Sequence, residues 1–142
     1  MLPAGVVYEH PVISFDIAAT ALALAGVTAQ PQLDGVNLIP HLAGLNTAPP
    51  HETLFWRFRF PSAKPAAHKW AIRRGQWKLV KNGYEPLALY DLTADPGEKQ
   101  NLISKQSELV EQLQSAWDNW NAGMKDSKNL ARSSKKSAEK SK

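Results

Sequence analysis

Four histidines are the side chains of this sequence best suited to acid–base or metal chemistry: His10, His41, His51 and His68. No two of them have the H-x-x-x-H spacing of paired helical metal ligands, and His51 with the glutamate after it lacks the second histidine of an H-E-x-x-H zinc site. The 142 residues include no cysteine, which excludes disulfides, thiolate zinc sites and a cysteine nucleophile. The sequence also lacks a phosphate-binding glycine loop and a G-x-S-x-G serine motif. We therefore expect no self-contained active site in this chain.

Five other polar residues have ordinary structural interpretations. Ser14 directly precedes an apolar run, so we expect it to cap a helix rather than to act as a nucleophile. Asp118 and Asn119 are neighbours on a predicted helix, where adjacent side chains diverge by about 100° and cannot chelate one ion. Arg57 and Arg59 lie one strand period apart and would share a face, which is more often solvated than anion-binding.

The net charge of +4 comes from the end of the chain. Residues 125–142 contain seven lysines and arginines but only two acids, so the rest of the chain is close to neutral. Because this stretch has almost no apolar residues to bury, we expect 124–142 to be a disordered basic tail. It has no aromatic residues for base stacking, and we expect no nucleic-acid partner. No apolar run approaches the ~20 residues of a membrane span. No secretory signal is visible at the start, and the sequence does not indicate a cellular compartment.

The elements that position these residues are predicted from periodicity and turn signals. Strand-like patterns cover residues 53–60, 69–73, 76–81 and 87–92, and Arg74 and Gly75 mark the tight turn of a hairpin. Ser104 is expected to open a helix over 105–122 that Gly123 ends. The expected apolar stripe of this helix consists of Leu109, Leu113, Trp117 and Trp120. The prediction is an α+β fold, a small antiparallel sheet of about four strands packed by a C-terminal helix.

The first part of the chain contains a predicted apolar helix that the rest of the chain can hardly bury. Residues 15–25 are nearly all apolar or alanine, and Gly26 supplies a stop signal. A helix that is apolar on most faces is a buried helix. A chain of 142 residues has little with which to bury it, which suggests a missing partner.

Five sequence strings, in a fixed order, resemble those of sulfatases of the alkaline-phosphatase-like superfamily, near the arylsulfatase and N-acetylgalactosamine-6-sulfatase branch. The family patterns are V-S-x-x-D-x-x-P-T-x-x-x-L-A-G, L-D-G-x-S/N-L-x-P-x-L-x-G, a strand that opens the C-terminal subdomain, A-x-R-x-G-x-W-K-L/Y and L-Y-D-L-x-x-D-P-x-E-x-x-N-L. The corresponding segments here are Pro11–Gly26, Leu33–Gly44, His51–Trp56, Ala71–Leu79 and Leu89–Leu102. Ala19 replaces the proline of the first pattern.

The resemblance implies a division of the chain and an absent catalytic centre. Residues 1–50 correspond to the C-terminal edge of the α/β sulfatase domain, with its helix packed on the large sheet, and 51–123 to the C-terminal subdomain. Complete family enzymes hydrolyse sulfate esters with a formylglycine, made from a C/S-x-P-x-R motif, beside a bound calcium. The motif is not found here, since Ser62–Ala66 has its proline one place late. The family's nucleophile, metal ligands and sulfate-binding residues precede the segment that matches Met1–Gly5. No catalytic residue, metal ligand or cofactor is therefore expected in this chain.

Two functional hypotheses follow. In the first, the chain is a C-terminal sulfatase fragment, inactive alone, that docks onto an N-terminal half or self-associates. It would complete the fold and shape the substrate cleft, with Arg57 and His68 contacting an anionic sugar. In the second, it is a free-standing binding module for sulfated polysaccharide, with Trp56 or Trp70 as a sugar platform and the basic tail gripping the polymer. Family members are usually exported, although this chain shows no signal of its own.

Overall fold

The computed structural model describes residues 2, 4–5, 7–27, 33–59 and 67–124. The chain divides into two compact units, Met1–Glu52 (unit 1) and Thr53–Lys142 (unit 2), which are described separately. All of the expected basic tail after Met124 lies outside the described residues, as does most of the segment between Arg57 and His68. Within the described residues, no helix is both long and apolar enough to span a membrane.

Unit 1 contains helix α1 (Phe15–Leu24) and the single-turn helix α2 (Ile39–Leu42). Gly26, at φ +71°, ends α1 as expected, with its amide bonded to the Ala23 carbonyl and the Val27 amide bonded to the Leu22 carbonyl. This pair of bonds is a Schellman cap, which favours glycine because the residue must take a left-handed conformation. The expected capping by Ser14 is wrong. Its hydroxyl makes no capping hydrogen bond, and its own backbone is already helical.

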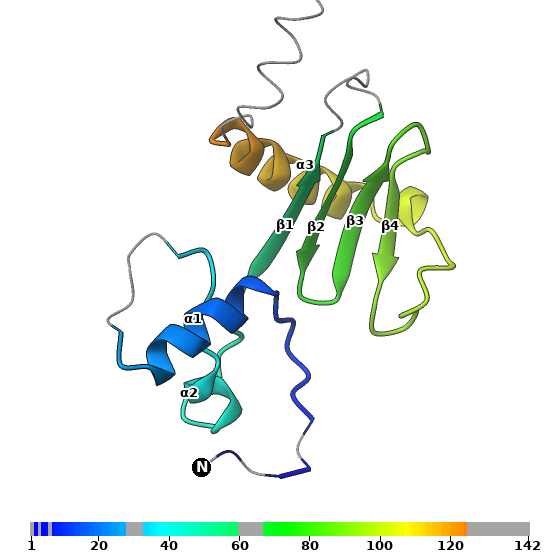
Figure 1. Cartoon of the computed structure of the whole chain (residues 1–142). Coiled ribbons are helices and arrows are strands. Elements are labelled where there is room, and N and C mark those ends of the chain that lie inside the picture. Colours follow the sequence, from blue (N-terminus) through cyan, green and yellow to red (C-terminus); the bar gives the residue numbers. More distant parts are fainter. Residues whose placement is uncertain (1, 3, 6, 28–32, 60–66, 125–142) are drawn as a thin grey trace, which may run out of the picture. The chain divides into compact units, whose positions relative to one another are not determined.

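Unit 2 is a four-stranded antiparallel sheet in the order β1 (Thr53–Phe58), β2 (Lys69–Arg74), β3 (Trp77–Asn82) and β4 (Ala88–Asp91). Figure 1 shows the strands side by side, with helix α3 (Ser107–Ala122) across one face. The β2–β3 hairpin turns at Gly75, whose φ of +55° is costly for other residues. The predicted α+β fold is confirmed.

The core of unit 2 forms where α3 meets the sheet. Ile72, Leu79 and Leu89 lie across β2, β3 and β4 and are fully buried with Leu113 of α3. Trp117 stacks on Trp70 with ring centroids 4.5 Å apart, and Trp120 stacks on Phe55 at 5.0 Å. The expected apolar stripe of α3 therefore makes the core, and four of the five tryptophans, Trp70, Trp77, Trp117 and Trp120, belong to it or pack against it.

The start of α3 differs from the sequence prediction. Ser104 does not open the helix, because it lies within a separate 3-10 turn, η2 (Ile103–Lys105), and α3 begins two residues after that turn. Asn101 fixes the segment that leads into η2, since its Oδ1 accepts from the amides of Leu89 and Ile103. Asp95 stabilises the turn before it, because its Oδ2 accepts from the amides of Lys99 and Gln100, each at 2.7 Å.

Candidate functional site

Arg57, the first residue expected to contact substrate, lies on β1 and is half-buried. Its Nη1 donates to Oδ1 of Asn121 at 3.0 Å, which ties the guanidinium to the last turn of α3. In the ladder Arg57 pairs with Trp70 of β2. A strand and a helix thus help to position the guanidinium, and such rigid elements hold a binding group more accurately than a loop does.

His68, the second expected residue, directly precedes β2 and is half-buried. Because Phe58 pairs with Lys69, the antiparallel register places Arg57 and His68 at the same end of the β1–β2 hairpin. A cationic and an imidazole group at one end of a sheet can both bind an anionic group. The residues 60–66 that join them lie outside the described part of the chain.

The carboxylate of Asp16 is the main polar centre of unit 1 and was not recognised as such in the sequence. Asp16 is fully buried and accepts hydrogen bonds from the amides of Ile13 (2.8 Å) and Val36 (2.9 Å). His51 Nε2 donates to the same carboxylate at 2.8 Å. Asp16 lies in the first turn of α1. Its contacts extend to residues 20 and 35 positions away, which no local motif could have indicated.

The environment of Asp16 favours the charged carboxylate. Burial by itself raises the pKa of this group, but the two backbone amides, the hydrogen bond from His51 and the charge of that histidine lower it more. The pKa of Asp16 therefore lies below its ordinary value of 3.8. A carboxylate–imidazole pair can serve acid–base chemistry. Here the carboxylate is fully buried and bonded to three groups of unit 1 itself, so it holds α1, the segment before α2 and residue 51 together.

The described residues contain no group of three or more His, Cys, Asp or Glu side chains that could hold a metal ion. The imidazole of His41 has a structural contact instead, because its Nδ1 donates to the backbone carbonyl of Ala48 at 3.0 Å. The part of the chain that the structure describes therefore does not fit a calcium site.

A model of the protein family described as "N-sulphoglucosamine sulphohydrolase, C-terminal" matches residues 2–122. The chain belongs to this family of sulfatase C-terminal domains. Its sheet, its C-terminal helix and the motifs that carry the resemblance all lie within the matched range. The sulfatase relationship expected from five short strings is therefore confirmed over most of the chain.

Named relatives are sulfatases as well. The chain is 32% identical over 105 residues to choline-sulfatase of Rhizobium meliloti (strain 1021), a match of 72% of this chain and 20% of that protein. It is 31% identical over 120 residues to arylsulfatase A of Bos taurus, which covers 68% of this chain and 23% of that protein. The sulfatase C-terminal domain thus spans less than a quarter of the length of these two relatives.

Solved structures support the same fold. The structure of Ps i-CgsB is 27% identical and aligns with a TM-score of 0.69, over 83% of this chain and 26% of that one. The structure of BT4656, solved with its substrate D-glucosamine-2-N,6-O-disulfate, is 26% identical with a TM-score of 0.57, over 80% of this chain and 25% of that one.

Proposed function

We propose that this chain is the C-terminal part of a sulfatase and does not hydrolyse sulfate esters by itself. The observation that carries the proposal is the family match over residues 2–122 together with the small share, 20% and 23%, of two full-length sulfatases that the chain covers. The nucleophile and the calcium ligands would then belong to an N-terminal part, which carries the formylglycine motif that this sequence lacks. This chain would complete the fold and shape the substrate cleft.

The exposed side of α1 supports the need for such a part. Ile17 and Leu24 are 71% and 69% exposed, and Ala21 lies between them at helical spacing, so one face of α1 presents apolar groups to solvent. Exposed apolar surface of this kind commonly marks an interaction site. We propose that residues 1–50 form the edge of the α/β sulfatase domain, that 51–123 form the small subdomain, and that 124–142 are a basic tail.

We propose a sulfated carbohydrate as the substrate class. The structure of one neighbour, BT4656, contains its substrate D-glucosamine-2-N,6-O-disulfate, and that of another, Ps i-CgsB, contains k-i-k-neocarrahexaose. Arg57 and His68 are the residues proposed to contact its anionic groups, and their shared end of the β1–β2 hairpin supports that role. Because the Arg57 guanidinium is held by Asn121, it would bind without much loss of side-chain entropy.

The test of the main proposal is gentle purification of the chain from its native host by size exclusion, followed by mass spectrometry. Co-elution with a larger chain that carries C/S-x-P-x-R, together with sulfate-ester hydrolysis by the complex and none by this chain alone, is the expected result. Elution of the chain by itself, with no sulfatase partner in the fraction, would refute the proposal that it completes the fold of an N-terminal sulfatase part.

The roles of Arg57 and His68 are tested in the active complex with R57A and H68A, and K105A serves as a control because Lys105 is exposed on η2. Loss of one charge-assisted hydrogen bond of ~1.5 kcal/mol or more should raise KM about tenfold for each variant. The K105A control should leave KM unchanged. Unchanged KM in both R57A and H68A would remove the two residues from the substrate site.

A further inference from the structure

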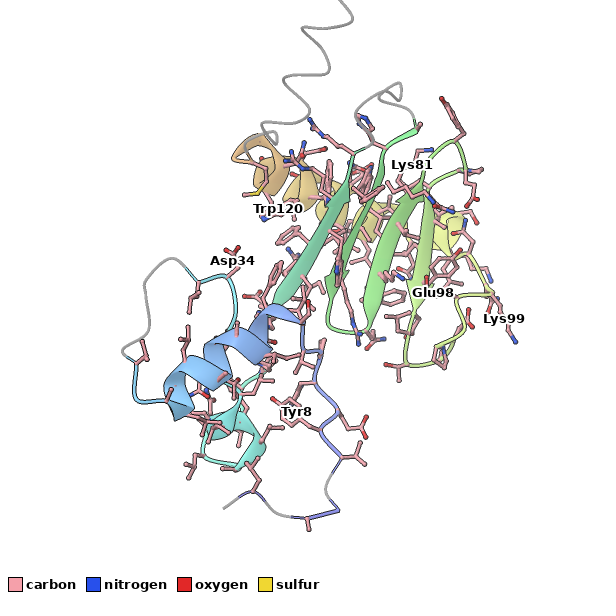
Figure 2. All side chains as sticks on the ribbon, in the orientation of Figure 1. Tyr8, Asp34, Lys81, Glu98, Lys99 and Trp120 are labelled. Carbon is pink, nitrogen blue, oxygen red and sulfur yellow. The ribbon has the colours of Figure 1, made fainter. Side chains whose placement is uncertain are left out.

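A pocket of about 410 Å³ lies on the sheet face opposite α3. The core residues Ile72 and Leu79 point toward α3, so their neighbours along β2 and β3 point to the other face. The pocket is lined by such neighbours and by the segment after β4, where Figure 2 labels Glu98. Its lining residues are Trp56, Ala71, Arg73, Lys78, Val80, Leu92 and Glu98.

The charged side chains that line this pocket have a net positive charge, which favours an anionic ligand. Arg73 of β2 pairs directly with Lys78 of β3, and like charges directly opposite each other in a sheet repel. Glu98 Oε1 accepts from Lys78 Nζ at 2.6 Å and offsets one of the two cations. Arg73 Nε donates to the carbonyl of Gly75 at 3.0 Å, which engages one of the five N–H donors of its guanidinium. Two cations thus face one carboxylate.

Trp56 gives the same pocket an aromatic wall. It is 40% exposed, whereas the other four tryptophans pack in or against the core beneath α3. In the ladder Trp56 pairs with Ala71, a buried alanine whose short side chain also lines the pocket. An aromatic ring with few polar groups placed around it is the usual construction of a small-molecule pocket, and the volume lies within the usual range.

We infer that this pocket binds a sulfated saccharide, with the sugar ring against Trp56 and a sulfate group between Arg73 and Lys78. The inference rests on the proposed function for its ligand class and adds a second contact, on the opposite face of β1 from Arg57. A guanidinium presents paired N–H donors that suit oxyanions. An added anion would also relieve the repulsion between the two cross-strand cations.

The test is binding of a sulfated carrageenan hexasaccharide to the full chain, measured by calorimetry and by the indole N–H resonance of Trp56 in two-dimensional NMR. The chemically desulfated hexasaccharide is the control ligand. R73A should weaken binding about tenfold, the loss expected for one charge-assisted contact. E98Q should tighten it about threefold, because it removes the negative charge beside the sulfate. K105A and E108Q, which change exposed charges on η2 and α3, should leave the affinity unchanged.

The opposite directions of R73A and E98Q distinguish ligand binding from a structural role, since damage to the fold would weaken binding in both. All variants keep residues 125–142, so binding by the basic tail would be equal in all of them and would overturn the inference. No binding by any variant would also overturn it, and would do so without bearing on hydrolysis by the assembled sulfatase. If the pocket variants instead weakened association with an N-terminal sulfatase chain, the pocket would be an interface and the saccharide assignment would be wrong.

Discussion

Replacing Asp16 by asparagine should destabilise unit 1 while leaving unit 2 intact. The carboxylate accepts from Val36 at Oδ1 and from Ile13 at Oδ2, and His51 donates to it as well. An asparagine side chain has the same shape but only one acceptor oxygen, because its other terminal atom is an NH₂ donor. One of the two backbone amides would then face a donor inside a fully buried site.

The size of this effect follows from the bonds that are lost. A hydrogen bond to a charged group contributes ~1.5–3 kcal/mol, and a buried donor left without a partner costs ~1–3 kcal/mol. We expect D16N to lower the free energy of opening unit 1 by about 3 kcal/mol, which is roughly a 100-fold loss of protection in amide hydrogen exchange. The amide of Val36 reports the effect directly, and the amide of Leu89, in unit 2, is the internal reference.

The matched control is D34N, which makes the same change in charge at an exposed aspartate of the same unit, labelled in Figure 2. It should leave the protection of Val36 within about threefold of the wild type, since exposed substitutions usually change stability by ~0.5 kcal/mol or less. Equal losses in D16N and D34N, or no loss in D16N, would refute the role given to the buried carboxylate.

The same site predicts a dependence on pH. The pKa of Asp16 is lowered in the folded state, so its contribution is fully present above the unfolded value near 3.8 and is lost as the pH falls through the lower folded value. Protection of Val36, corrected for intrinsic exchange, should therefore decrease below about pH 3.8, and this decrease should be absent in D16N. A decrease of equal size in D16N would assign the acid sensitivity to other groups.

Three further substitutions test the packing. G35A should destabilise unit 1 by about 1–3 kcal/mol in hydrogen exchange, because a Cβ there would overlap the Phe15 carbonyl and lie 2.9 Å from the Asp16 amide. L113A should destabilise unit 2 by about 3–5 kcal/mol in denaturant titration, because Leu113 is fully buried in its core. L24E should reduce self-association of the isolated chain in analytical ultracentrifugation without loss of helix signal, because Leu24 is 69% exposed.

Each of these predictions has a matched control. G123A adds a Cβ that meets only the Trp120 carbonyl at 3.5 Å, an ordinary contact, and should hardly change the free energy of unfolding. L45A removes a side chain that is 82% exposed and should have almost no effect on stability. For L24E the control is A94E, at an exposed position of unit 2, which should leave association unchanged. A G35A variant as stable as G123A would show that the segment after Asp34 moves away from α1 at little cost.

The sequence alone was sufficient for those parts of the fold that depend on short-range patterns. The four strands, the glycine at the hairpin turn and the apolar stripe of α3 were all predicted, because hydrophobic period and turn chemistry act within a few residues. Ser14 shows the limit of such rules. A good capping residue makes no cap when the backbone at its position is already helical.

Tertiary structure alone decided which distant side chains meet. His51 reaches Asp16 across 35 positions, and the Trp56 pocket is closed by Glu98 from beyond the end of β4. It also decided which tryptophan remains available, since Trp70 is stacked on Trp117 while Trp56 stays partly exposed. The physical reason is that alternation along a strand assigns residues to two faces, but only the packing of α3 determines which of the two faces it covers.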